Sequence, residues 1–189
     1  RDLHSTSRRQ ASDVYKRQIR DKGIDLLLEA LAACPTDTPI TLTLVGSDHG
    51  GYTEQMQALA ARLHLEDKVQ FLGSRTDVPQ LLQAADLFVH PATCQEGFGI
   101  TLIEAMASGV PCLAFPKGAI PEIIGPEIDG FLTEEVSAAA LTAGINRALE
   151  LFTKAPHHWH TLCKNARQKA ELFSIERTVA QLETLYREQ

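Results

Sequence analysis

Two glutamates and two glycines form the segment of this sequence with the clearest chemical potential. Glu96 and Glu104 are separated by seven residues, and Gly97 and Gly99 lie between them, just before an apolar run. Glycines that open a helix leave backbone N–H groups available, and these groups and the helix dipole favour an anion. Two carboxylates would repel a phosphate itself, but they suit a diphosphate whose flanking ribose and sugar hydroxyls donate hydrogen bonds to them. The plainer alternative is a helix acid stabilised by the dipole and a solvated loop acid.

Two further loops carry residues that suit phosphate chemistry. Lys22 is followed by Gly23 and then by a helical pattern, which places a cation at the start of a helix; an exposed lysine without a role is the alternative. Residues 48–51 (DHGG) follow a strand pattern and either approach phosphates or form a flexible turn. Neither G-x-G-x-x-G nor G-x-x-x-x-G-K-[ST] is present, which disfavours a dehydrogenase or a P-loop enzyme.

The histidines and cysteines do not predict a metal centre. His157, His158 and His160 stand beside Trp159, where surface or helix-packing roles are favoured over metal binding. His90 ends a predicted strand beside the glutamate loop, and from there its ring can reach a bound ligand. No C-x-x-C pair occurs among the four cysteines, which favours buried reduced thiols over a zinc site or a disulfide framework.

Composition and charge describe an ordinary globular domain. The chain has 189 residues, of which 44% are hydrophobic and 22% charged, with a net charge of −6. Residues 1–20 hold six of the 18 basic and two of the 24 acidic side chains, so the remainder is strongly acidic and nucleic-acid binding is disfavoured. No run of about 18 apolar residues is present, so no transmembrane segment is expected. We expect a cytoplasmic protein, or one held peripherally at a membrane as part of a longer chain.

Helical and strand patterns alternate along the chain from residue 24. Strands are predicted over residues 40–45, 69–72, 87–90, 112–115 and 130–132. Helices are predicted over residues 24–33, 53–63, 78–85, 100–108, 138–152, 158–173 and 175–187, with one helical turn at 121–124 and Thr53 as a possible N-cap. This order indicates an α/β fold, a doubly wound (Rossmann-like) parallel sheet that binds its ligand at the carboxyl ends of the strands.

The segment EGFGITLIEAMASGVP, residues 96–111, resembles the hallmark of the retaining GT-B glycosyltransferases of family 4 (glycosyl transferases group 1). Further segments resemble that family in its own order, namely KGIDLLLEAL (22–31), LTLVG (42–46), FLG (71–73), ADLFVHPA (85–92) and GAIPEIIGPEIDGFL (118–132). The resemblance covers residue 20 to the C-terminus. It implies the C-terminal half of a GT-B fold, which binds a nucleotide sugar.

The resemblance also implies roles for individual residues. Glu104 would bind the ribose and Glu96 the donor sugar, while Lys22 would neutralise charge growing on the departing diphosphate. The positions assigned to catalysis are Glu96, Lys22 and Arg17, and those assigned to donor binding are Glu104, Gly97, Phe98, Gly99, Ile100, Thr101, Gly46, Ser74, Arg75 and His90. The amides around Gly99 would hold the diphosphate, and the loop after Gly73 would lie against the base. No metal and no cofactor are expected, since the nucleotide sugar is a substrate.

The first 18 residues are expected to be a non-native tail. DVYKRQ (13–18) resembles the translation of a transposase adapter used in sequencing libraries, and Arg17, five residues before the lysine, falls inside it. Residues 19–189 then form the nucleotide-sugar-binding domain, with C-terminal helices over residues 138–189. We expect residues 11–15 to form a strand in the place of a missing first strand. The final helix, 175–187, is expected to expose its apolar face.

The function expected from this resemblance is transfer of a sugar from a nucleoside diphosphate sugar, commonly UDP-linked, to a glycan, lipid or small-molecule acceptor with retention. The acceptor would bind to an N-terminal domain that is absent here, so the fragment alone is expected to be inactive. The alternatives are a GT-B nucleotide-sugar epimerase and a non-catalytic nucleotide-binding module. Binding of a panel of nucleoside diphosphates would separate these classes.

Overall fold

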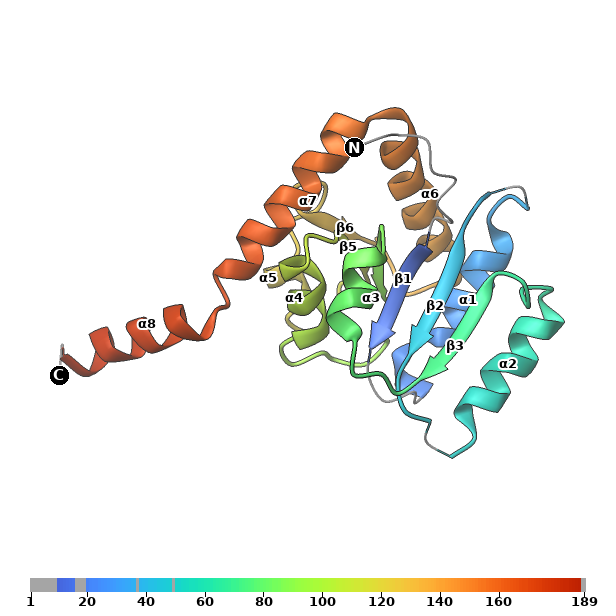
Figure 1. The fold of residues 1–189 in the computed structure, drawn as a ribbon, viewed down its shortest axis with the longest axis horizontal. Coiled ribbons are helices and arrows are strands. Elements are labelled where there is room, and N and C mark those ends of the chain that lie inside the picture. Colours follow the sequence, from blue (N-terminus) through green and yellow to red (C-terminus); the bar gives the residue numbers. More distant parts are fainter. Residues whose placement is uncertain (1–9, 16–19, 37, 49, 188–189) are drawn as a thin grey trace.

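The computed structural model of the chain describes residues 10–15, 20–36, 38–48 and 50–187. The strands are β1 (Gln10–Tyr15), β2 (Thr41–Val45), β3 (Val69–Gly73), β4 (Phe88–His90), β5 (Cys112–Ala114) and β6 (Gly130–Leu132). The helices are α1 (Ile24–Ala33), α2 (Tyr52–Arg62), α3 (Val78–Ala84), α4 (Ile100–Ala107), α5 (Ile120–Ile123), α6 (Ala138–Lys154), α7 (Pro156–Glu171) and α8 (Ile175–Arg187), and a 3-10 turn, η1, spans Arg20–Lys22. Helices and strands alternate as expected (Figure 1).

All the described strand pairings are parallel. Hydrogen bonds join β1, β2 and β3 in that order, and β4, β5 and β6 in that order. The two groups meet where β1 contacts β4, so β1 lies between β2 and β4 (Figure 1). The expectation of a strand over residues 11–15 is confirmed, because β1 pairs with β2 from Gln10↔Thr41 to Tyr15↔Val45. The doubly wound α/β class is also confirmed.

Successive strand residues bury their side chains on opposite faces of the sheet. Leu44 and Val89 belong to a core that packs against α1, α2 and α6. Their neighbours Val45 and Phe88 belong to a second core that packs against α3, α4 and α5. Strands covered on both faces are therefore apolar at consecutive positions, which explains why the short apolar runs in the sequence predict them.

Several element boundaries differ from the sequence prediction, and α2 shows the clearest physical cause. The helix begins at Tyr52 with Gly51 as its N-cap, so Thr53 is inside the helix and the prediction of Thr53 as N-cap is wrong. Gly50 and Gly51 both adopt left-handed conformations, with φ of 70° and 74°. Consecutive glycines tolerate this geometry, so the chain turns into the helix earlier than predicted. The Thr53 N–H donates to the Asp48 carboxylate instead (N···O 3.0 Å).

The C-terminal helices differ in how they pack. Helix α7 contacts α4 and α6, and it begins at Pro156, two residues before the predicted start. Helix α8 has no buried residue and projects away from the rest of the molecule (Figure 1). Its apolar side chains at Ile175, Val179 and Leu182 are exposed, which confirms the expected open face. None of the helices in the described part of the chain is long and apolar enough to cross a membrane.

Candidate functional site

Three of the predicted site residues meet at one carboxylate oxygen. Lys22 Nζ lies 3.4 Å from Glu96 Oε2, and His90 Nε2 lies 3.5 Å from the same oxygen. The Lys22 and Glu96 side chains are 13% and 11% exposed, and His90 is buried. An ion pair so removed from water interacts more strongly than a surface pair. Lys22 and Glu96 lie 74 positions apart in the chain, so the fold itself brings their charges together.

The loop that carries Lys22 is fastened to the loop that follows β4. Gly23 adopts φ 64°, and a side chain at this position would overlap the carbonyl oxygen of Pro91. The Thr93 N–H donates to the carbonyl oxygen of Asp21 (2.9 Å). Only glycine permits this close approach in a left-handed conformation. The contact holds the end of η1 against the chain segment that leads to Glu96.

The backbone of Glu96 is fixed from the other side by the loop after β5. The Ala119 N–H donates to the carbonyl oxygen of Glu96 (2.9 Å). Gly118 has φ 57°, and a side chain there would overlap the Glu96 backbone. The sequence analysis quoted Gly118 within a family motif but did not predict this role, because the contact spans 22 positions and has no local signal.

His90 is the last residue of β4 and is 3% exposed. Its ring stacks on that of Phe88, with centroids 6.4 Å apart and an interplanar angle of 29°. Among the residues that the structure describes, Nε2 has no hydrogen-bond partner, although Glu96 Oε2 lies 3.5 Å away. A buried polar group left unpaired costs about 1–3 kcal/mol. A hydrogen-bond partner for His90 Nε2 would therefore be favourable.

The helix start at Gly99 has the features expected of an anion site. Gly99 is the N-cap of α4 with φ 68°, and no side chain caps the helix. The first backbone N–H groups of α4 are therefore left for another acceptor. Thr101 is buried and its hydroxyl has no partner among the described residues, while Glu104 lies farther along α4 with an exposed side chain.

The predicted base-binding loop contains a preformed ion pair. Arg75 Nε and Nη2 donate to the two carboxylate oxygens of Asp77 at 2.8 and 2.7 Å, and the hydrogen bond holds the pKa of Asp77 below its usual value. Ser74 and Arg75 are exposed, and Gly46 donates its N–H to the carbonyl oxygen of Gly73 (2.9 Å). The ends of β2 and β3 are thus joined beside this loop. Arg17 lies outside the described residues.

The remaining candidates do not form a second site. His157, His158 and His160 are exposed on α7, and no group of three His, Cys, Asp or Glu within the described ranges is placed to hold a metal. Burial raises the pKa of the Cys112 thiol strongly and that of Cys163 to about 11. Thiols with raised pKa values are poor nucleophiles at neutral pH.

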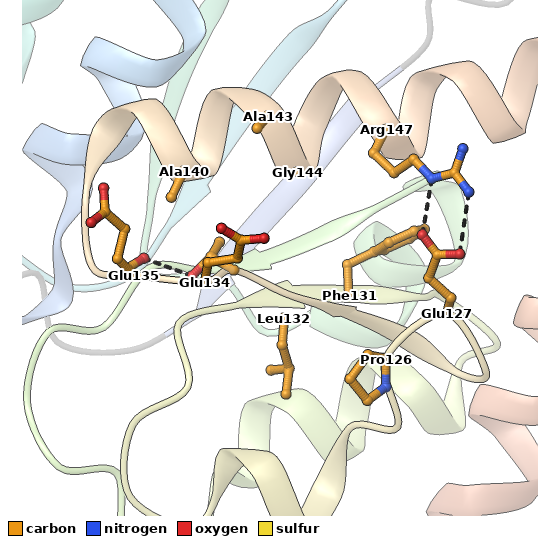
Figure 2. Close-up of a pocket in the computed structure, with 11 residues that line it drawn as sticks. Pro126, Glu127, Phe131, Leu132, Glu134, Glu135, Ala140, Ala143, Gly144 and Arg147 are labelled. Atoms are coloured by element: carbon orange, nitrogen blue, oxygen red, sulfur yellow. Dashed lines mark hydrogen bonds and ion pairs between the residues drawn. The ribbon is translucent and has the colours of Figure 1, made fainter.

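A separate cavity of about 730 Å³ lies between α6 and residues 126–135, which include β6 (Figure 2). Phe131 and Gly144 are among its lining residues, and at one end Arg147 donates to the Glu127 carboxylate at 2.9 and 3.2 Å. Within the described part of the chain, none of the predicted donor-binding or catalytic residues lines it. The cavity and the Lys22–Glu96–His90 cluster are therefore distinct features.

Comparison with known sequences gives a consistent family match. The profile of the family described as "Glycosyl transferases group 1" matches residues 13–169. One curated relative, the N-acetyl-alpha-D-glucosaminyl L-malate synthase of Bacillus anthracis, is 35% identical over 166 residues, which cover 87% of this chain and 42% of that protein. The chain thus spans less than half the length of this relative.

Solved structures show the same fold. HepE of Anabaena, solved with UDP and glucose, is 32% identical with a TM-score of 0.79, and the match covers 92% of this chain and 48% of that one. The C-terminal domain of LpcC, a glycosyl transferase group 1 family protein from Francisella tularensis, matches with a TM-score of 0.76 at 22% identity, which concerns the fold alone. That match covers 88% of this chain and 87% of the domain.

Proposed function

The chain belongs to the glycosyl transferases group 1 family, and on this premise we propose that it is the donor-binding half of a retaining family 4 glycosyltransferase. Its α/β fold is that of the C-terminal domains of GT-B glycosyltransferases. The observation that carries the proposal is the pairing of Lys22 with Glu96, largely out of water, in a fold whose α4 begins without a side-chain cap. Anion-binding amides, one cation and a sugar-binding carboxylate are the groups that a nucleotide sugar requires.

The proposed reaction breaks the bond between the anomeric carbon of the donor sugar and a diphosphate oxygen. Negative charge then grows on the departing diphosphate, where the Lys22 ammonium and the amides of Gly99, Ile100 and Thr101 would stabilise it. Glu96 would accept hydrogen bonds from the sugar hydroxyls and Glu104 from the ribose hydroxyls. This division of labour needs no metal ion.

A UDP-linked donor is the form of the proposal that the relatives favour. HepE was solved with UDP and glucose and, separately, with UDP-glucose. The Bacillus anthracis relative is named for an N-acetylglucosaminyl product of malate, and another relative is a lipopolysaccharide glucosyltransferase of Escherichia coli. The acceptors differ while the shared half remains similar, which supports acceptor binding by a separate N-terminal domain.

We also propose the domain boundaries that the sequence analysis expects. Residues 1–18 would be a non-native tail, and residues 19–189 would be the donor domain of a longer protein. The match to 42% of the Bacillus anthracis relative and 48% of HepE is in keeping with this division. The 189-residue chain would then bind the donor without transferring the sugar.

Isothermal calorimetry with UDP, GDP and ADP tests the proposal directly. We expect the chain to bind one of them with a dissociation constant in the micromolar-to-millimolar range, and Glu104→Ala and Lys22→Met each to weaken that binding at least about tenfold, or about 1.4 kcal/mol. Glu176→Ala on α8 and Lys154→Ala on α6 are matched exposed controls that should bind as the unaltered chain does. No binding to any nucleotide, or equal affinity in all variants, would exclude the proposal.

A further inference from the structure

We propose that His90 is a positioning residue of the donor site, whose Nε2–H holds the Glu96 carboxylate toward the donor sugar when Lys22 turns to the diphosphate. This inference rests on the proposed function and extends it to a residue that acts through Glu96. The sequence analysis expects His90 to touch the donor itself, and the geometry points to a different role.

The burial of Nε2 indicates whether His90 contacts the donor sugar directly or acts on it through Glu96. The atom is covered, and the described part of the chain offers it no hydrogen bond. The acceptor that faces it is Glu96 Oε2 at 3.5 Å. A hydroxyl of the bound nucleotide sugar cannot reach Nε2 without displacing the atoms that cover it. A small closing movement, by contrast, brings Nε2 and Oε2 into hydrogen-bond distance.

Lys22 and His90 both approach the same oxygen of Glu96. Lys22 Nζ and His90 Nε2 share Oε2, with the lysine at 3.4 Å. A diphosphate at the start of α4 attracts the lysine ammonium, because its phosphate oxygens carry more charge than one carboxylate. The largely buried Glu96 carboxylate then loses the ammonium charge beside Oε2 while an anion lies nearby, which is unfavourable. The His90 Nε2–H offers Oε2 a hydrogen bond in place of that ammonium and adds no competing negative charge.

Strand pairing and ring packing fix the position of the His90 side chain. Its backbone pairs with Ala114 of β5, and its ring packs on Phe88. Pro91 follows, and the Gly23 loop packs on the Pro91 carbonyl. A side chain fixed by a strand and by ring packing orients its neighbour better than one on a mobile loop.

The test separates binding of the sugar from binding of the nucleotide. Calorimetry would compare UDP and GDP with UDP-glucose, UDP-N-acetylglucosamine and GDP-mannose, in the unaltered chain and in His90→Leu and His90→Gln. Leu removes the imidazole N–H, whereas the Gln amide places an N–H near the Nε2 position. We expect His90→Leu to weaken binding of the preferred nucleotide sugar about tenfold but binding of the nucleotide alone less than about twofold. In the proposed site, the nucleotide is bound by Glu104 and the backbone amides.

Rescue and controls complete this experiment. His90→Gln should recover most of the preference for the nucleotide sugar, and Glu96→Gln should show the same selective loss as His90→Leu. His160→Leu, an exposed histidine on α7, should change neither affinity. In the unaltered chain, nitrogen-15 NMR of the imidazoles should show a slowly exchanging Nε2–H for His90 when the nucleotide sugar is added. This spectrum tests the proposal even if His90→Leu does not fold.

The outcomes distinguish the two proposals. If the unaltered chain binds no nucleotide, the proposed function fails and the role of His90 fails with it. If it binds nucleotides but prefers no nucleotide sugar, or if His90→Leu keeps the full preference, the role of His90 alone is overturned. An equal loss for nucleotide and nucleotide sugar, with a lower melting temperature, shows a merely structural histidine. Absence of the Nε2–H signal contradicts the proposal in the same way.

Discussion

Glu96 and Asp129 are both largely removed from water, and they are stabilised by different groups. Glu96 has the Lys22 ammonium within 3.4 Å. Asp129 is 5% exposed, and its Oδ1 accepts a hydrogen bond from the Gly125 N–H at 2.8 Å. Burial raises the pKa of Asp129, although the hydrogen bond and the charge of Lys169 oppose that rise. The charged form of Asp129 is therefore less favourable in the folded chain than in water.

Asp129→Asn should stabilise the chain at neutral pH. A carboxyl group whose folded pKa is raised stabilises the fold while protonated, and this contribution is lost as pH rises through the folded pKa. Asn keeps an acceptor for Gly125 and carries no charge, so its advantage should be present at pH 7 and shrink as the pH falls toward 4. Urea unfolding at both pH values measures the difference. Asp129→Ala, which leaves the Gly125 N–H unpaired, should be less stable than Asn at both; a loss with Asn at pH 7 would contradict this account.

At the scale of elements, loops at the carboxyl ends of the strands hold one another in place. The turn before α1 packs on the segment after β4, and the segment after β5 packs on Glu96. Each contact depends on a left-handed glycine that brings one backbone against another. The charged cluster is thus supported by backbone contacts from three separate loops.

Gly118→Ala should cost more than Gly109→Ala. Both glycines have positive φ, 57° and 79°, so each substitution costs roughly 1–2 kcal/mol in backbone conformation. An alanine Cβ at position 109 meets only the Cys163 carbonyl at 4.0 Å, whereas at position 118 it overlaps the Glu96 backbone. We expect the larger loss of unfolding free energy for Gly118→Ala, together with weaker nucleotide-sugar binding. Equal losses of unfolding free energy for the two variants would mean that the backbone around Glu96 moves aside without cost.

At the scale of the whole molecule, α8 is the element least attached to the fold. It projects from the body, and no residue in it is buried (Figure 1). Helix α7, which precedes it, buries Leu162 completely. The stability of the domain should therefore depend on α7 and hardly on α8.

Leu182→Glu should leave the free energy of unfolding within about 0.5 kcal/mol of the unaltered chain, because this α8 side chain is 48% exposed. Leu162→Ala should cost about 2–5 kcal/mol, because it leaves a cavity under α7. Urea unfolding of the two variants beside the unaltered chain makes the comparison. A loss of 2 kcal/mol or more for Leu182→Glu would show that α8 packs on the domain in solution.

The fold was predictable from the sequence where the signal is local. Apolar pairs such as Leu44 and Val45 show strands covered on both faces, and the order of elements follows from them. The start of α2 was missed, because it depends on the conformations of two glycines. Lys22 and Glu96 were identified by family resemblance, but their meeting with the covered Nε2 of His90 depends on packing between distant loops, which no local pattern encodes.

The close contact between Gly23 and the Pro91 carbonyl oxygen has a consequence for engineering this domain. A chimera that takes its glutamate loop from a relative, in order to change the sugar used, would place a foreign backbone beneath the native turn of residues 21–23. Because the two segments interlock without side chains between them, neither can adapt by changing a rotamer. The two segments should be transplanted as a pair, with residues 118–119 included.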